Sequence, residues 1–370
     1  MSKQAVIPVT DPGAQLAALR LEIDEAIGRV LSSGYYILGP EVEAFEREFA
    51  EYIGTTHAVG VANGTDALAL GLRALGIGHG DEVITVSHTA VATVAAIEQA
   101  GATPVLVDVE PGFLTLDPYL LEEVMSEKTR AVVPVHLYGQ AADLSKIRSF
   151  CHRHHLALIE DVSQAHGATW DGVKLGSIGH IGVFSCYPTK NLGALGDAGI
   201  VVTNDSATAD RLRRLRQYGW KERNMSLEPG ANSRLDEVQA AILRLKLRFL
   251  DTGNASRRSI ADHYTSALAE TSVQTPITRS ASTHVFYLYV VEDSDRDALS
   301  ENLAQHGVGS AIHYPFAVHQ QAAYSGRLRT SSSMTVTERA VQRIISLPMF
   351  PELNSEGVEK VLFTLKKYRQ

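Results

Sequence analysis

The sequence predicts an α/β protein in which a large, mostly parallel sheet is covered by helices on both faces and a smaller α+β domain follows. Two observations lead to this prediction. Short apolar runs rich in Val and Ile alternate with helix-length segments from about residue 57 to residue 205, which is the rhythm of a parallel sheet. At 370 residues, the chain also exceeds the usual length of a single domain.

Seven segments are predicted as strands of the large sheet. Several of them are apolar on both faces, so we expect helices to cover both sides of the sheet. The segments are HAVGVAN (57–63), DEVITV (81–86), TPVLVDV (103–109), RAVVPVHLYG (130–139), LALIEDV (156–162), IGVFSCY (181–187) and GIVVTND (199–205).

Helical spacing is found before and after these strands. Residues 14–32 and 40–53 are predicted helices, and so are TADRLRRLRQYG (208–219) and LDEVQAAILRLKLRFL (235–250), of which the last is long enough to link two domains. From about residue 255 the pattern changes to a helix, the strand VFYLYVV (285–291) and turn-rich pieces. We therefore predict a large domain over residues 1–250 and a small domain over residues 251–370.

Composition excludes several classes of function. The formal charge of −8 is spread without a basic stripe, so the sequence gives little support to binding of nucleic acid or of an anionic membrane. The start of the chain lacks the pattern of a signal peptide, no apolar run is long enough to span a membrane, and only two cysteines are present. We expect a cytoplasmic protein. The cluster CHRHH (151–155) is predicted to be the end of a helix, and no metal site is expected.

A phosphate site is suggested where the first predicted strand meets a helix. In VANGTDALALGL (61–72), Asn63, Gly64 and Thr65 lie at the start of the helix, where free N–H groups and the positive end of the helix dipole favour an anion. The alternative is a simple N-cap, made by Thr65 or Asp66, that requires no ligand. The sequence has no G-x-G-x-x-G here, which disfavours a dinucleotide fold.

A carboxylate and a lysine follow two later strands. LALIEDVSQAHGA (156–168) ends a buried strand with Glu160 and Asp161, and a carboxylate at that depth needs a cation or strong donors. An ion pair with a nearby Arg or Lys remains an alternative explanation. Lys190 comes one crossover and one strand later, so both side chains are expected to face the same cleft.

The surroundings of Lys190 suggest covalent chemistry. In FSCYPTKNLGALGDAG (184–199), the lysine follows aromatic residues and precedes a glycine-rich turn that lets the backbone approach a planar ligand. A Schiff-base lysine and a buried aspartate facing a pyridinium nitrogen are the arrangement that makes pyridoxal phosphate an electron sink. Thr65 and Ser185 are then expected to hold the phosphate of this cofactor.

These motifs resemble the DegT/DnrJ/EryC1/StrS sugar aminotransferases over nearly the whole chain. The resemblance implies a type I aminotransferase fold, a homodimer with active sites between subunits, and transfer of an amino group from L-glutamate to a keto group of a nucleotide-linked sugar, for amino-sugar biosynthesis. The stretches that carry it are GYYILGPEVEAFEREFA (34–50), NGTDALALGLRALGIGHGDEV (63–83), EDVSQAHGA (160–168), FSCYPTKNLGALGDAG (184–199), NSRLDEVQAAIL (232–243), HYP (313–315) and SLPMFP (346–351).

The resemblance also implies roles for individual residues. Lys190 would be the Schiff-base lysine that shuttles the proton, and Asp161 would pair with the pyridine nitrogen of pyridoxal phosphate, which passes through its pyridoxamine form during turnover. Gln164 would lie against the cofactor ring. The implied phosphate contacts are Gly64, Thr65, Ser185 and, from the partner subunit, Asn232, and the implied substrate contacts are His313 and Tyr314.

The same comparison separates activities and shows departures. Related sugar 3-dehydratases have a histidine in place of Lys190, so the lysine favours transamination. Ala90 stands where relatives often carry an aromatic residue that stacks on the cofactor, a role then left to His88 or another side chain. Tyr287 stands where a histidine is common, and Cys186 replaces a usual aromatic residue.

The position of amination is suggested by one segment. VPVHLYGQAADL (133–144) resembles relatives that act at C-3 of dTDP-6-deoxy-3-keto sugars, although some C-4 enzymes have similar segments. We predict C-3, with C-4 or a cyclitol ketone as the enzymatic alternatives. The remaining alternative is a regulatory protein that binds the cofactor or the sugar nucleotide without turnover, which Lys190 and Asp161 argue against.

Overall fold

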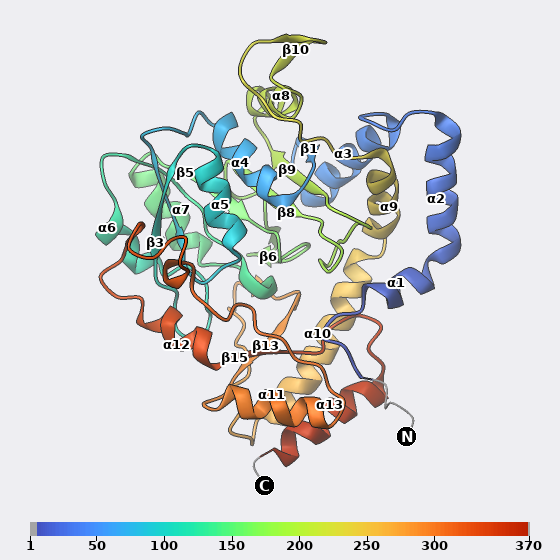
Figure 1. Cartoon of the computed structure of the whole chain (residues 1–370), viewed down its shortest axis with the longest axis vertical. Helices are drawn as coiled ribbons and strands as arrows, with labels where there is room; N and C mark the ends of the chain where they lie inside the picture. Colours follow the sequence, from blue (N-terminus) through green and yellow to red (C-terminus); the bar gives the residue numbers. More distant parts are fainter. Residues whose placement is uncertain (1–5, 369–370) are drawn as a thin grey trace.

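An eight-stranded sheet lies at the centre of the structure, a computed structural model in which residues 6–368 are described (Figure 1). The strand order is β1-β9-β8-β5-β4-β2-β3-β14. All seven predicted strands belong to this sheet. Its strands are β1 (His57–Val61), β2 (Glu82–Val86), β3 (Thr103–Val107), β4 (Thr129–Val132), β5 (Ala157–Asp161), β8 (Ile181–Ser185), β9 (Gly199–Thr203) and β14 (Arg329–Thr330).

The sheet is mostly parallel, as predicted, and β9 is the exception. It pairs antiparallel with both β1 and β8. The segment 186–198 between β8 and β9 contains no helix, so the chain turns back instead of crossing over the sheet. Strand β4 is shorter than its predicted range of 130–139, because Pro134 has no N–H to extend the ladder.

Thirteen α-helices are found within residues 6–368. The predicted helix 40–53 is confirmed over the same range, whereas the predicted helix 14–32 is divided at Leu19, and 235–250 is interrupted at Arg248 and Phe249. The helices are α1 (Pro12–Ala18), α2 (Arg20–Ser33), α3 (Pro40–Ile53), α4 (Gly64–Ala74), α5 (Val91–Gln99), α6 (Leu121–Val124), α7 (Leu144–Arg153), α8 (Ser206–Leu215), α9 (Glu237–Leu247), α10 (Leu250–Leu268), α11 (Arg296–Gln305), α12 (Thr335–Arg343) and α13 (Ser355–Lys367).

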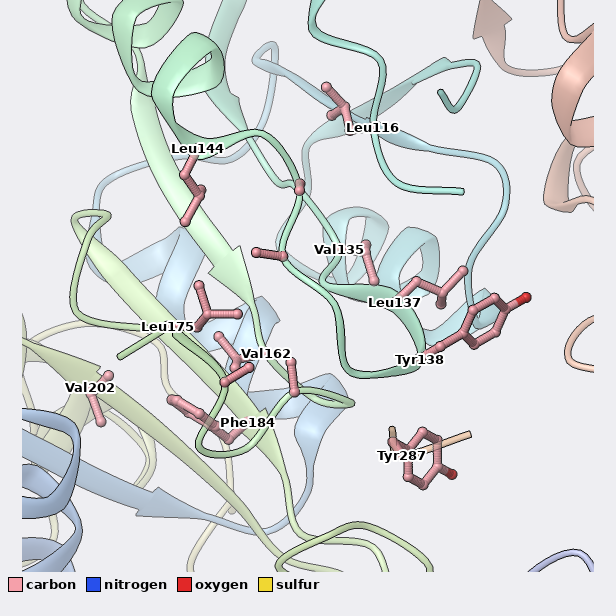
Figure 2. Close-up of a cluster of buried hydrophobic side chains, with 14 of the residues drawn as sticks. Leu116, Val135, Leu137, Tyr138, Leu144, Val162, Leu175, Phe184, Val202 and Tyr287 are labelled. Carbon is pink, nitrogen blue, oxygen red and sulfur yellow. The ribbon is translucent and has the colours of Figure 1, made fainter. Parts of the chain in front are cut away.

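Helices cover both faces of the sheet, as predicted. On one face, α4, α5 and α8 pack on strand residues such as Val83 and Ile159. On the other face, α3 and α7 pack on the alternate strand residues, such as Ile84 and Leu158. Figure 2 shows part of this second cluster, where the Phe184 ring lies beside Val162. The sheet edge that carries the polar strand ends is therefore held between two apolar layers.

Residues from α10 to α13 form a separate apolar cluster at one end of the molecule (Figure 1). Its centre is the antiparallel pair β13 (Tyr289–Glu292) and β15 (Ile344–Leu347), so the predicted strand 285–291 is confirmed only in its second half. Strand β14 returns to the edge of the large sheet and pairs with β3. The division at residue 250 stays a prediction. Within residues 6–368, no helix combines the length and the apolar character that a membrane span requires.

Five short strands complete the structure and form two small antiparallel sheets. One of them, the hairpin at the top of Figure 1, projects beyond α8. The other joins residues near 170 to the segment that leads into β13, so it ties the large sheet to the last third of the chain. The short strands are β6 (Thr169–Trp170), β7 (Val173–Lys174), β10 (Trp220–Glu222), β11 (Met225–Ser226) and β12 (Ser282–Thr283).

Candidate active site

A cavity of about 740 Å³ lies at the carboxyl ends of β1, β2, β5 and β8. This is the edge at which parallel α/β sheets hold their ligands. Of the nine residues predicted to contact cofactor or substrate, all except Asn232 line this cavity. They are Gly64, Thr65, Asp161, Gln164, Ser185, Lys190, His313 and Tyr314.

The N-terminus of α4 forms one end of the cavity. Asn63 is the N-cap, and its side-chain oxygen accepts a hydrogen bond of 2.8 Å from the N–H of Asp66, so the alternative cap at Thr65 or Asp66 is wrong. A Cβ on Gly64 would lie 2.5 Å from the Cβ of Ser185, so only glycine allows α4 to begin this close to β8. The N-terminus of α4 and the side chains of Thr65 and Ser185 line the same cavity. The positive end of the helix dipole and the two hydroxyls favour an anion such as phosphate there.

The two adjacent carboxylates at the end of β5 have different environments. Glu160 is completely buried and accepts hydrogen bonds of 2.9, 2.8 and 2.7 Å from the N–H groups of Gly176, Ile178 and Gly179. The ring of His136 lies 3.3 Å from the same carboxylate. Because β-strand side chains alternate, Glu160 points away from the cavity and fastens a loop.

Asp161 points into the cavity, although only 6% of its surface is exposed. Hydrogen bonds rather than an ion pair hold it. The Thr93 hydroxyl donates to Oδ2 at 3.0 Å, and the N–H of Ser163 donates to Oδ1 at 3.1 Å. These donors fix the carboxylate in one orientation, in which it can accept a further hydrogen bond from an N–H or O–H group of a ligand.

Lys190 lines the same cavity, in the turn that follows β8. Its Nζ is 4.4 Å from the centroid of the Tyr287 ring, whose hydroxyl lies 3.1 Å from that of Thr189. Burial lowers the pKa of His166 to about 3 and also lowers the pKa of His313 below its usual value. The positive charge of Lys190 is the second cause of both shifts. Both imidazoles are therefore neutral near pH 7.

Gln164 connects two sides of the cavity. Its Oε1 accepts a hydrogen bond of 2.8 Å from the N–H of Tyr138, which fixes the orientation of the amide. Its Nε2 then donates to the hydroxyl of Tyr314 at 3.0 Å. His313 precedes Tyr314 and contacts Ser346 through Nδ1 at 2.9 Å. The sequence-predicted substrate residues therefore lie next to the residue predicted to contact the cofactor ring.

The departures from the family pattern have different outcomes. Ala90 lines the cavity, but His88 is buried and its Nε2 contacts the Tyr138 hydroxyl at 2.8 Å, so a stacking role for His88 is wrong. The phenol rings in the cavity wall are those of Tyr187, Tyr287 and Tyr314. Cys186 is completely buried, and burial raises the pKa of its thiol to about 12.

Two further sequence predictions concern residues outside the cavity. Asn232 is exposed and lies away from the cavity lining, so its predicted role requires a second subunit. The CHRHH cluster lies at the C-terminal end of α7, as predicted. Within residues 6–368, no three His, Cys, Asp or Glu residues are arranged to hold a metal ion.

Sequence reasoning missed Thr93, which orients Asp161. This threonine lies in the first turn of α5, directly after β2, and the Thr89 hydroxyl lies 3.0 Å from its own. A polar pair in the turn after a buried strand is a usable signal, because that turn borders the carboxyl edge of the sheet. Tyr187 also lines the cavity and was not predicted to do so.

The residues present fit pyridoxal phosphate. The Gly64 position admits no side chain next to Ser185, which leaves the start of α4 open to an anion. Asp161 is an oriented, buried acceptor, and Lys190 is an amine in the wall of the same cavity. An anion site, an amine and a buried carboxylate are the three groups that this cofactor requires of a protein.

Known proteins are similar to this chain over almost its full length. The erythromycin biosynthesis sensory transduction protein EryC1 of Saccharopolyspora erythraea is 46% identical over 361 residues, covering 97% of this chain and 99% of the relative. A dTDP-3-amino-3,4,6-trideoxy-alpha-D-glucose transaminase of Streptomyces venezuelae is 44% identical over 365 residues, covering 98% and 96%.

A solved structure agrees with these relatives. The crystal structure of S. venezuelae DesV in complex with a ketimine intermediate superposes with a TM-score of 0.97 at 44% identity, covering 99% of this chain and 100% of that one. The sequence matches the DegT/DnrJ/EryC1/StrS aminotransferase family over residues 18–366. The fold, the cavity and these similarities together lead to one conclusion: the chain belongs to the DegT/DnrJ/EryC1/StrS aminotransferase family.

Proposed function

We propose that this protein is a pyridoxal-phosphate aminotransferase that moves an amino group from L-glutamate to a keto-sugar nucleotide, at C-3 of a dTDP-3-keto-6-deoxyhexose. The observation that carries the proposal is that Lys190 and Asp161 line one cavity together with the N-terminus of α4. The names of the relatives support the substrate class, since the S. venezuelae relative is a transaminase of a dTDP-linked 3-amino sugar.

Each residue has a proposed role that its place in the cavity supports. Gly64, Thr65 and Ser185 would hold the phosphate, and Gln164 would lie against the ring. The bound cofactor would supply an electron sink that stabilises negative charge on the substrate carbon. Asp161, held by Thr93 and Ser163, would accept a hydrogen bond from the ring nitrogen of the cofactor and keep that nitrogen protonated.

Lys190 would hold the cofactor covalently at rest and move the proton during turnover. A neutral amine at Nζ would take a proton from the substrate carbon that bears the nitrogen and would give it to the cofactor carbon on the other side of that nitrogen, as a general base and then a general acid. The imidazoles of His166 and His313 are neutral near pH 7, so they add no positive charge near Lys190. His313 and Tyr314, at the opposite side, would contact the sugar.

Absorbance spectroscopy tests this function. The purified protein with pyridoxal phosphate is expected to show the visible band of a lysine-bound cofactor, which L-glutamate bleaches and a dTDP-3-keto-6-deoxyhexose restores. The Lys190→Ala variant is expected to lack the band and to lose turnover by about 10³-fold or more. Full turnover by this variant would exclude the role of Lys190. A band that L-glutamate does not bleach would favour the regulatory alternative, and a bleached band that no keto-sugar nucleotide restores would exclude this class of substrate.

The position of amination needs a separate measurement. Carbon-13 NMR of the product distinguishes an amine at C-3 from one at C-4, because only the aminated carbon moves to the range of carbon bonded to nitrogen. We expect the C-3 amine when the 3-keto sugar is offered and no amination of the 4-keto isomer. Efficient amination at C-4 would reverse this assignment and leave the transaminase function intact.

We also propose a homodimer with shared active sites in the cytoplasm. Tyr35, Tyr36 and Phe316 are large apolar side chains that remain more than half exposed in one chain, which supports a partner surface. Asn232 is exposed and outside the cavity of its own chain, which suits a residue that reaches the cavity of a partner. Both cysteines are unpaired and buried, as suits a reducing compartment.

Subunit mixing tests the shared site. Lys190→Ala and Asn232→Ala proteins are expected to be impaired separately. After the two are unfolded together and refolded, half of the random dimers are hybrids with one intact site, so about a quarter of the wild-type activity should return. If Asn232 served its own chain, mixing would restore nothing.

A further inference from the structure

Tyr138 lies outside the cavity lining and contacts two of its walls. Its backbone N–H donates to Gln164 Oε1 at 2.8 Å. Its hydroxyl donates to the carbonyl oxygen of His313. Figure 2 shows the Tyr138 ring pointing away from the buried cluster, on the same side of it as Tyr287. One residue therefore links the predicted cofactor side of the cavity to the predicted sugar side.

The hydrogen-bond chain behind Tyr138 has a single consistent direction. The His313 carbonyl can only accept, so the one proton of the Tyr138 hydroxyl is directed to it. His88 Nε2, which lies 2.8 Å from the same hydroxyl oxygen, must then be the N–H donor. This assignment also agrees with the other ring nitrogen, since His88 Nδ1 is buried without a partner among residues 6–368, as an unprotonated acceptor can be.

The imidazole of His88 keeps this state over a wide pH range. His88 is 1% exposed, and burial lowers its pKa to about 4, so the ring stays neutral at physiological pH. The two rings meet edge to face, with centroids 5.9 Å apart and planes at 79°. The hydroxyl of Tyr138 is thus fixed by packing as well as by hydrogen bonds.

The backbone at Tyr138 and Gly139 is also held by the segment 285–288. The N–H of Leu288 donates to its carbonyl oxygen at 3.3 Å, and the N–H of Val285 donates to the carbonyl of Gly139 at 3.0 Å. A Cβ on Gly139 would lie 2.9 Å from the N atom of Phe286, which shows how closely these two segments approach. The turn at 137–139 is therefore anchored before it contacts His313.

We propose that Tyr138 and His88 are positioning residues for the sugar side of the active site. The chain from His88 through the Tyr138 hydroxyl to the His313 carbonyl holds the His313–Tyr314 segment in register with Gln164, whose amide also contacts Tyr314. This inference rests on the proposed function, because it assigns the pair to the keto-sugar nucleotide rather than to the cofactor. The cofactor side keeps its own link, the Tyr138 N–H, which no side-chain change removes.

The first test needs no activity. Hydrogen–deuterium exchange of the peptide that covers residues 311–317 is compared in the wild type, Tyr138→Phe and the control Tyr264→Phe, all without substrate. Tyr264 is also buried and donates to a carbonyl, that of Pro348 at 3.1 Å, so the control loses a hydrogen bond of the same kind elsewhere. We expect about tenfold faster exchange of 311–317 in Tyr138→Phe only, the effect of losing one hydrogen bond.

The second test separates the two substrates. In Tyr138→Phe, the KM for the keto-sugar nucleotide is expected to rise about tenfold, while the KM for glutamate and the absorbance of the lysine-bound cofactor stay within about twofold. His88→Phe should give the same result, and the double variant should be no worse, because both changes break one chain. His88→Gln keeps an N–H donor at similar reach and should recover most of the loss.

The outcomes separate this inference from the proposed function. Unchanged exchange at 311–317 in folded Tyr138→Phe overturns the positioning role, whatever the activity. Equal rises in both KM values with a loss of cofactor absorbance also overturn it, because they indicate a general structural role. If the wild type aminates no keto-sugar nucleotide, the proposed function fails, and the exchange measurement still decides whether Tyr138 holds the segment.

Discussion

The active-site cavity has two walls that are built in different ways. The first wall comes from the carboxyl edge of the large sheet and includes Gly64, Asp161 and Lys190, each within a few residues of a buried strand. The second wall comes from the last third of the chain and includes Tyr287, His313 and Tyr314, which lie in segments without a regular element. Under the proposed function, the first wall would carry the groups for chemistry, and the second would carry the groups for substrate selection.

This difference has a physical basis. Side chains at strand ends inherit the rigidity of a sheet that is packed on both faces, which suits groups that must meet reacting atoms within fractions of an ångström. Irregular segments tolerate replacement with little effect on the core, which suits groups that differ between substrates. Changes in the first wall should therefore cost more than changes in the second, and the following variants test that order.

The largest effect on activity is expected from Asp161→Asn. Asparagine keeps the size, its oxygen can still accept from the N–H of Ser163, and its NH2 group can donate to the Thr93 hydroxyl. It is neutral, however, and cannot hold a protonated ring nitrogen. We expect kcat to fall by about 10³-fold, equivalent to about 4 kcal/mol in the barrier, with little change in thermal stability. Steady-state kinetics and a thermal melt measure both quantities. A loss below about tenfold would contradict the proposed role.

The neighbouring residue provides the matched control. Glu160→Gln places an amide where three backbone N–H groups now converge on a carboxylate, so a donor meets donors. We expect a loss of about 3 kcal/mol in the free energy of unfolding and a kcat within about twofold of the wild type at 25 °C. The reverse pattern, intact stability with lost activity, would mean that the two carboxylates have been assigned to the wrong roles.

A smaller effect is expected from Gly64→Ala at the phosphate end of the first wall. The new Cβ would lie 2.5 Å from the Cβ of Ser185, so α4 must move away from β8 at its first residue. The dissociation constant of pyridoxal phosphate should rise about tenfold, measured by equilibrium dialysis. Gly28→Ala in α2, where a Cβ has nothing within 4 Å, is the control and should leave cofactor binding unchanged. If Gly64→Ala and Gly28→Ala bound pyridoxal phosphate with equal affinity, the start of α4 would not be part of the phosphate site.

The first wall was largely predictable from the sequence, and the second was not. Gly64, Asp161 and Lys190 directly follow buried apolar runs, so strand periodicity placed them at one edge before any coordinate was known. The packing of Tyr138 against His88 joins positions 50 residues apart in sequence, and no local pattern encodes it. His88 was one of the side chains suggested for stacking on the cofactor ring, whereas the structure has it buried behind the cavity wall and hydrogen-bonded to a tyrosine that sequence reasoning did not single out.

Two features of the large sheet were also not predictable from the sequence: the direction of β9 and the pairing of β14. The antiparallel direction of β9 depends on the path of a loop without a helix, and apolar runs look the same in either direction. Pairing of β14 with β3 involves only two residues, Arg329 and Thr330, in a stretch without apolar periodicity. Both features arise from contacts between distant segments, which is why they required a structure.

The smallest effect is expected in the second wall, from Tyr287→Phe. The phenyl ring keeps the face that lies 4.4 Å from Lys190 Nζ, and only the hydroxyl contact of 3.1 Å with Thr189 is lost. We expect kcat to fall about threefold, whereas Tyr287→Leu, which removes the ring and its attraction for the ammonium group, should lower kcat about tenfold. Single-turnover rates with glutamate measure the step in which Lys190 moves the proton.

Thr189→Val provides the partner change for this prediction. It removes the other half of the same hydroxyl contact, so it should match Tyr287→Phe, and the double variant should be no slower than either single one. If Tyr287→Phe instead lost more than about a hundredfold, the hydroxyl would have to exchange a proton with the substrate or with Lys190. The second wall would then take part in the chemistry, and the division of roles between the two walls would fail at the residue whose ring faces the lysine.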